Sequence, residues 1–122
     1  MKVAVYGTLR RGQRANGIIE GIGQYVGTGV ITSMCRMANL GYFPAICDNL
    51  DGDYKPVVDV YEVDNLAPLD YYEGYPRLYT RSVLNVALED DEEIQATVYV
   101  MSDPNDTVND PEVVGGDWTK RG

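Results

Sequence analysis

Short apolar runs separated by glycine and proline dominate the chain and predict strands. The run KVAVY at residues 2–6 is β-branched and ends in Gly-Thr, as expected of a buried strand that enters a tight turn. Residues 56–63, PVVDVYEV, predict a second strand led in by proline. Residues 79–88 and 94–101 flank the acidic run EDDEE and predict a hairpin with a solvated turn. Residues 23–37 hold strand-forming residues broken by glycines, which is typical of a bent or bulged strand.

Helical patterning is scarce and is strongest over residues 65–73, NLAPLDYYE. Asn65 or Asp64 can cap the N-terminus, and Pro68 falls in the first turn, where no amide donor is needed. Gly74 can take the left-handed conformation that ends a helix. We therefore predict about two helical turns that end at the glycine.

The rest of the pattern suggests one compact domain. Residues 15–22 form a second, weaker helical pattern, and the polar, proline-broken tail at 102–122 predicts a surface loop anchored by Trp118. At 122 residues, the chain has the size of a single domain spanning 1–122. Five or six strands, many glycines and two short helices predict a mixed or barrel-like sheet of the α+β class rather than regular βαβ repeats.

Composition places the chain among ordinary globular proteins, with 44% apolar and 24% charged residues. No stretch approaches the roughly 20 apolar residues that a membrane span needs. The N-terminus turns to glycine and arginine too soon for a signal peptide. We expect a cytoplasmic protein with no membrane partner.

The chain has no histidine and two cysteines, Cys35 and Cys47. This set offers too few soft ligands for a zinc site, so we expect no metal and predict both cysteines in or near the core as small hydrophobic residues. Without an imidazole, acid–base chemistry near neutral pH falls to a carboxylate or a tyrosine.

The net charge of −9 is unevenly distributed along the chain. Residues 1–36 carry five cations and one anion, whereas residues 37–122 carry five cations and eighteen anions. The acidic bulk argues against a nucleic-acid partner. The basic cluster LRRGQR at residues 9–14 is the exception, and it suits one anionic group on a small ligand better than a phosphate backbone. A nucleic-acid or partner adaptor built on this cluster is the minor alternative.

The stretch VYGTLRRG at residues 5–12 is the first candidate site. A strand that stops in Gly-Thr exposes successive backbone amides, which can cradle an anion or oxyanion. Gly7 lets a ligand approach the backbone closely, and Arg10 or Arg11 can add charge. The alternative is a strand followed by an exposed basic turn.

The stretch LDYYEGYPRLYTR at residues 69–81 is the second candidate site. Glu73 falls in the last turn of the predicted helix, where the helix dipole and apolar neighbours both raise a carboxyl pKa. Such a group can accept and return a proton near neutral pH. Tyr79 and Arg81, two residues apart on a strand, could orient a substrate. The alternative is a glutamate paired to Arg77 or Arg81, with the tyrosines as amphipathic core.

Together with VYEV at 60–63 and GGDW at 115–118, these stretches resemble the gamma-glutamylcyclotransferase-like superfamily. They resemble most its short branch, which includes gamma-glutamylamine cyclotransferase. The resemblance runs over essentially the whole chain, in the expected order. It implies a mixed, mainly antiparallel β-barrel with a few short helices around it.

The resemblance also implies a reaction, in which the substrate's own α-amine attacks its γ-carbonyl. An amine or amino acid is released and 5-oxoproline closes, with no protein nucleophile, metal or cofactor required. The loop after the first strand would hold the γ-glutamyl part through backbone amides, a glutamate would be the acid/base, and a tyrosine would help to close the pocket. The residues implied are Tyr6, Gly7, Thr8, Leu9 and Tyr79 for substrate binding and Glu73 for catalysis.

Two departures from the family pattern leave substrate choice open. Val58-Asp59 stands where the family often has Gly-Glu, and the tail has GGDW rather than Ser-Gly-Asp-Trp. A non-catalytic binding module for a γ-glutamyl-like ligand stays an alternative, because turnover can be lost through changes in the pocket walls, which no motif marks. We expect the leaving group to contact loops at residues 35–54 and the tail, but these segments carry no recognisable code for it. The oligomeric state is also left open.

Overall fold

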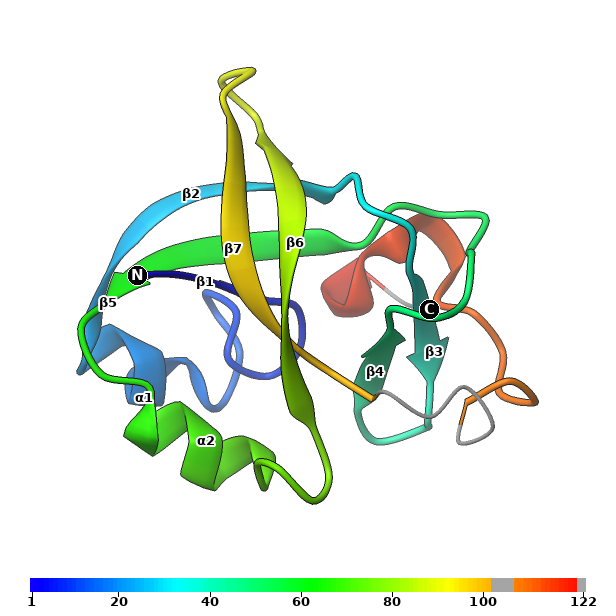
Figure 1. Ribbon diagram of the computed structural model, residues 1–122, viewed down its shortest axis with the longest axis horizontal. Coiled ribbons are helices and arrows are strands. Elements are labelled where there is room, and N and C mark those ends of the chain that lie inside the picture. Colours follow the sequence, from blue (N-terminus) through cyan, green and yellow to red (C-terminus); the bar gives the residue numbers. More distant parts are fainter. Residues whose placement is uncertain (102–106, 121–122) are drawn as a thin grey trace.

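A computed structural model of the protein describes residues 1–101 and 107–120. Within them, five strands close a barrel in the order β1-β5-β2-β6-β7, and β1 pairs with β7 to complete the circle (Figure 1). Neighbours are antiparallel, except that β1 and β7 are parallel. The mixed, mainly antiparallel barrel is thus confirmed. The strands are β1 (Lys2–Val5), β2 (Gly23–Ile31), β3 (Arg36–Asn39), β4 (Pro44–Cys47), β5 (Val57–Val63), β6 (Thr80–Leu88) and β7 (Glu93–Val100).

Strand β7 changes its partner along its length. Thr97 and Val98 pair with β1, whereas Val100 pairs with β4, which in turn forms an antiparallel hairpin with β3. Tyr99 therefore lies where the sheet splits between β1 and β4. Backbone groups at such a split lack a ladder partner and need another one.

Side chains on the two faces of the barrel sheet form two separate apolar clusters. Val58 and Val60 of β5 belong to the cluster inside the barrel, which also holds Trp118. Tyr61 and Val63 of the same strand belong to the second cluster, which packs against the helices. The position of Trp118 at 1% exposure confirms it as the anchor of the tail.

The helices are short, as predicted. They are α1 (Asn16–Glu20), α2 (Ala67–Glu73) and the 3-10 helices η2 (Val114–Gly116) and η3 (Trp118–Lys120). The Asn65 side chain accepts a 3.0 Å hydrogen bond from the Ala67 amide, and Gly74 ends α2 in the left-handed conformation at φ 69°. None of the described helices is long and apolar enough to cross a membrane.

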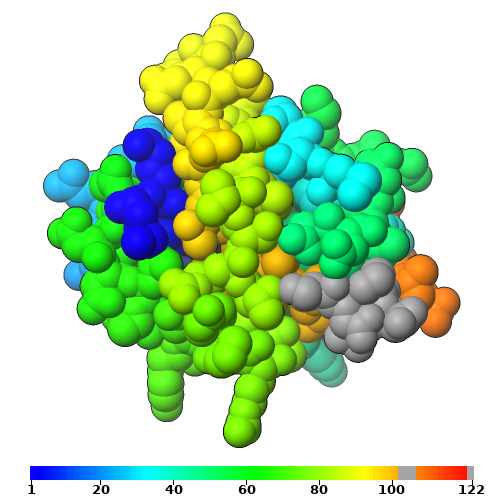
Figure 2. All heavy atoms as spheres, viewed as in Figure 1, coloured from blue at the N-terminus to red at the C-terminus, as the bar shows by residue number. Residues whose placement is uncertain are grey.

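The hairpin β6–β7 carries the acidic run of residues 89–93 at its tip. All five residues are exposed, and the tip stands out from the body of the protein in Figures 1 and 2. The prediction of a solvated turn is confirmed.

Three expectations need correction. The bent strand over 23–37 is a bulged β2 that ends at Ile31, followed by the separate strand β3. Residues 35–54 are not simply loops, because they contain β3 and the fully buried β4. The described part of the tail is more than a loop, since it adds a bridge to β3 and two 3-10 helices. Tail residues 102–106 and 121–122 lie outside the described residues.

The two cysteines are buried free thiols, as predicted.

Candidate active site

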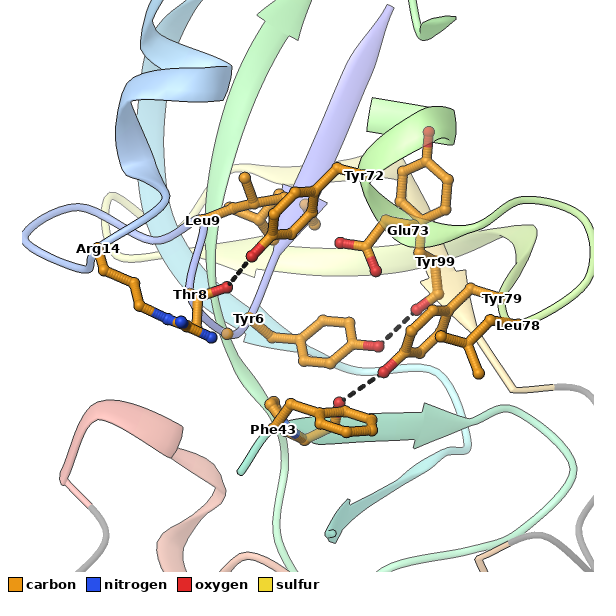
Figure 3. Close-up of a pocket in the computed structure, with 14 residues that line it drawn as sticks. Tyr6, Thr8, Leu9, Arg14, Phe43, Tyr72, Glu73, Leu78, Tyr79 and Tyr99 are labelled. Atoms are coloured by element: carbon orange, nitrogen blue, oxygen red, sulfur yellow. Dashed lines mark hydrogen bonds between the residues drawn. The ribbon is translucent and has the colours of Figure 1, made fainter. Parts of the chain in front are cut away.

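A cavity of about 210 Å³ opens beside the split between β1 and β4 (Figure 3). A water molecule occupies roughly 30 Å³ of liquid, and pockets for drug-sized ligands measure roughly 300–1,000 Å³. The cavity therefore suits a small ligand. It is lined by Ala4, Val5, Tyr6, Gly7, Thr8, Leu9, Arg14, Phe43, Pro44, Tyr72, Glu73, Leu78, Tyr79 and Tyr99.

Glu73 brings a carboxylate into this cavity. It is the last residue of α2, and the left-handed Gly74 turns the chain away directly after it. The side chain lies among Tyr72, Tyr79 and Tyr6 in Figure 3. Burial raises its pKa from 4.5 to about 7. The upward shift was predicted, and its cause is burial.

No described residue forms a hydrogen bond or an ion pair with the Glu73 carboxylate. The alternative in which it pairs with Arg77 or Arg81 is therefore wrong. The Arg81 guanidinium lies 4.1 Å from the centre of the Tyr75 ring, and its Nε is 3.8 Å from an Asp70 oxygen. Arg81 does not line the cavity, so it does not orient a substrate beside Tyr79 as expected.

The Tyr6 hydroxyl bonds to backbone groups on both strands at the split in the sheet. It donates a 2.6 Å hydrogen bond to the Tyr99 carbonyl of β7 and accepts one of 3.2 Å from the Ile46 amide of β4. Burial raises the pKa of this hydroxyl well above its ordinary value, and the charges of Tyr79 and Glu73 raise it further. The phenol thus stays neutral, and it forms a fixed wall of the cavity.

Tyr79 lies beside Tyr6 and is also held by a backbone carbonyl of β4 (Figure 3). Its hydroxyl donates a 3.0 Å hydrogen bond to the Pro44 carbonyl, and burial, then the charge of Glu73, raises its pKa. Both predicted tyrosines line the cavity with their hydroxyls already bonded to the backbone. Among the described lining residues, Glu73 is the group that titrates near neutral pH.

The loop after β1, residues 7–9, lines the cavity and is called the cradle below. The Arg10 amide donates to the Gly7 carbonyl at 3.1 Å, so a tight turn forms as predicted. Within the described residues, the amides of Gly7, Thr8 and Leu9 donate to no backbone or side-chain acceptor. These donors are therefore free to meet a ligand.

Gly7 and Thr8 fix the position of the cradle. A Cβ at Gly7 would lie 3.1 Å from Pro44 Cγ, which is tighter than ordinary contact, so only glycine lets the loop pack here without a shift. The Thr8 hydroxyl lies 2.7 Å from the Tyr72 hydroxyl, next to Glu73 on α2.

Arg10 has a structural role, which corrects the expectation that it meets a ligand. It is buried, and its guanidinium bonds to Asp59 at 3.2 Å and to Asp117 at 2.8 Å. The Asp59 carboxylate also accepts bonds from the Arg11 amide and the Thr28 hydroxyl. The network ties the cradle loop to β5, β2 and the tail.

Arg14 is the basic residue of the 9–14 cluster that reaches the cavity. The Arg11 guanidinium lies instead 4.2 Å from the centre of the Tyr25 ring, away from the cavity lining. The cluster itself signalled a cation near the cradle, but spacing alone did not select Arg14 among the three arginines.

Sequence reasoning missed Phe43 and Tyr99, which line the cavity but carry no motif that marks them. Tyr72 and Leu78 belong to the 69–81 stretch, whose apolar residues were expected beside Glu73, and both line the cavity. No group of three His, Cys, Asp or Glu side chains in the described part of the chain is placed to hold a metal ion.

Comparisons with known proteins show the family and the fold. A family model described as gamma-glutamyl cyclotransferase, AIG2-like, matches residues 3–120. A crystal structure of an AIG2-like protein from Mus musculus is 27% identical, with a TM-score of 0.77 over 91% of this chain and 84% of that one. No curated protein sequence gives a significant match.

Two further solved structures share the fold. An uncharacterized protein from Pyrococcus horikoshii is 23% identical, with a TM-score of 0.66 over 98% of this chain and 91% of that one. A gamma-glutamyl cyclotransferase is 16% identical, with a TM-score of 0.65 over 84% of this chain and 66% of that one. At these identities the likeness concerns the fold alone.

Proposed function

The chain belongs to the gamma-glutamyl cyclotransferase, AIG2-like family, and we propose that it cleaves a small γ-glutamyl compound to 5-oxoproline and a free amine or amino acid. The observation that carries the proposal is the Glu73 carboxyl, which faces a small cavity and has a pKa raised by burial to about 7. The cradle, whose amides donate to no acceptor among the described residues, lines the same cavity.

The reaction needs one proton acceptor that later becomes a donor. The ionised Glu73 takes a proton from the α-ammonium of the substrate, and the freed nitrogen forms a bond to the γ-carbonyl carbon. The bond from that carbon to the leaving nitrogen then breaks, and Glu73 returns a proton to this nitrogen. The new ring nitrogen loses its second proton, and the released amine takes this proton up and leaves as an ammonium. A carboxyl with a pKa near the working pH serves both steps.

The remaining features favour ring closure over other chemistry. Attack within one molecule already brings the reacting atoms together, so the protein has only to hold a folded conformer and exclude water. The free cradle amides supply donors for negative charge that develops on an oxygen. Tyr6 and Tyr79 supply walls whose hydroxyls stay neutral and bonded to the backbone.

The proposal is tested with a panel of γ-glutamyl amines and dipeptides, by measuring 5-oxoproline release. Glu73→Gln is expected to keep the fold and to lower kcat by about 10²–10⁴-fold, the typical cost of losing a general acid/base. Glu93→Gln, at an exposed position on β7, serves as the matched control and should keep the parent rate. Turnover by Glu73→Gln at the parent rate would show the mechanism to be wrong.

The rival function is a binding module that retains a γ-glutamyl-like ligand without turnover. Binding of several panel compounds by the unsubstituted protein, with no 5-oxoproline released from any of them, would favour this rival over the enzyme.

A further inference from the structure

We propose that Arg14, together with the free amides of the cradle, binds the α-carboxylate of the γ-glutamyl group and thereby holds the α-amine against Glu73. The inference rests on the proposed function, because it assigns one group of the substrate to one part of the same cavity. It makes Arg14 the residue that selects an α-amino-acid head.

The backbone brings Arg14 to the cradle. The Ala15 amide donates a 3.0 Å hydrogen bond to the Thr8 carbonyl, so the chain from residue 8 to residue 15 closes on itself. The Asn16 side chain donates a 2.9 Å bond to the Leu9 carbonyl and fixes the same closure. Arg14, one residue before Ala15, therefore returns to the cavity wall, and Figure 3 shows its guanidinium beside Thr8.

Among the described residues, neither a carboxylate nor an aromatic ring holds the Arg14 guanidinium, which distinguishes it from Arg10 and Arg11. Arg10 is bonded to two carboxylates and Arg11 lies over a tyrosine ring. Within residues 1–101 and 107–120, no carboxylate forms an ion pair with Arg14. In a chain of net charge −9, a cation left unpaired at a cavity wall offers the charge that a ligand carboxylate needs.

The charges of the cavity match the head of a γ-glutamyl compound. Among the described lining residues, Glu73 is the acidic side chain and Arg14 the basic one. An α-amino-acid head carries an ammonium and a carboxylate on one carbon. With the carboxylate on Arg14 and the cradle amides, the ammonium on the same carbon turns toward Glu73, which is the orientation that proton removal requires.

The test compares two ligands that differ only in this carboxylate, 5-oxoproline and 2-pyrrolidinone. Their affinities are measured by NMR titration for the unsubstituted protein, Arg14→Gln and Arg14→Lys. Arg11→Gln is the matched control, because it removes the same charge from the same loop at a residue outside the cavity lining. Thermal unfolding of each variant checks that the fold is kept.

We expect Arg14→Gln to weaken 5-oxoproline binding by about tenfold, as hydrogen bonds to a charged group imply, and to leave 2-pyrrolidinone unchanged within about twofold. Arg14→Lys should lie between the two, since an ammonium keeps the charge without the fork of donors. Arg11→Gln should match the unsubstituted protein. Equal effects of Arg14→Gln on both ligands, or no effect on 5-oxoproline, would overturn the assignment.

A second readout separates this inference from the proposed function. KM for a γ-glutamyl amine without a carboxylate on its leaving group should rise in Arg14→Gln by a similar factor. If the unsubstituted protein releases 5-oxoproline and Arg14→Gln does so with the same KM, the Arg14 assignment alone fails. If the unsubstituted protein neither binds nor releases 5-oxoproline, both proposals fail.

Discussion

The hydroxyls of Thr8 and Tyr72 lie 2.7 Å apart and join the cradle to the helix that carries Glu73. Both residues line the cavity, and they are 64 positions apart in the chain. The bond is exposed, so it contributes little to the free energy of folding. It ties the cradle to the end of α2 that carries Glu73, the group that we propose to transfer protons.

Tyr72→Phe removes this link while keeping the ring. We expect kcat/KM for 5-oxoproline release to fall, by less than about tenfold, because one hydrogen bond of this kind is worth about 1 kcal/mol. The free energy of unfolding should change by no more than about 1 kcal/mol. Tyr71→Phe is the control, since that side chain is 91% exposed and outside the cavity lining. Unchanged kinetics in Tyr72→Phe would contradict the link.

Tyr6→Phe should destabilise the fold more than Tyr79→Phe. The Tyr6 hydroxyl satisfies two buried backbone groups, at Tyr99 and Ile46, whereas the Tyr79 hydroxyl satisfies one, at Pro44. Each group left unsatisfied costs about 1–3 kcal/mol. Urea unfolding of both variants measures the difference, and a larger loss in Tyr79→Phe would contradict the role given to the split.

Glu73 should make stability fall as pH rises from about 4.5 to about 7. The folded carboxyl holds its proton up to about pH 7, while the unfolded one releases it near 4.5, so the folded state binds more protons in this window. Glu73→Gln removes this pH dependence. Between pH 4.5 and 7, the free energy of unfolding of Glu73→Gln minus that of the parent protein should therefore increase, by at most about 3 kcal/mol.

Glu62 is a useful control, because its pKa is shifted in the opposite direction to that of Glu73. Its pKa is lowered by its hydrogen bond to the terminal amine, at 2.6 Å. Its stabilising effect is therefore present at neutral pH and lost as pH falls through the lowered pKa. Glu62→Gln should weaken the protein at neutral pH and have no effect in strong acid, as chemical unfolding at several pH values would reveal. The same trend in both variants would contradict the assignment for Glu73.

The rate of 5-oxoproline formation should depend on pH through the same carboxyl. Because the ionised form of Glu73 accepts the first proton, kcat/KM should rise with pH and level off above about 7. The measurement is a pH–rate profile with a substrate whose amine titrates well above that value. A profile that falls between pH 5 and 7 would assign the essential group to an acid instead.

The sequence predicted the features that depend on neighbours along the chain. Asn65 and Gly74 mark the ends of α2, and the apolar residues around Glu73 predict its raised pKa. The glycine-threonine turn after β1 predicts the cradle. Each of these rests on capping, turn chemistry or local burial, which short segments encode.

Features set by distant partners were not predictable in this way. Arg10 is withdrawn from the cavity by Asp59 and Asp117, which lie 49 and 107 positions away in the chain. Strand β4 has four buried residues and therefore no alternation to reveal it. The split at Tyr99 follows from barrel closure, a pairing between the N-terminal and last strands that no local pattern specifies.

The network around Arg10 also defines how far the protein can be shortened. A chain that stopped before Asp117 would lack both a partner of the buried guanidinium and the Trp118 indole, which belongs to the larger apolar cluster. The buried guanidinium would then keep Asp59 as its partner but lose Asp117, and removing one partner from a buried charge network is costly. Shortened versions of this protein should therefore retain Asp117 and Trp118. These tail residues help to hold the cradle loop in place through Arg10 and the apolar cluster.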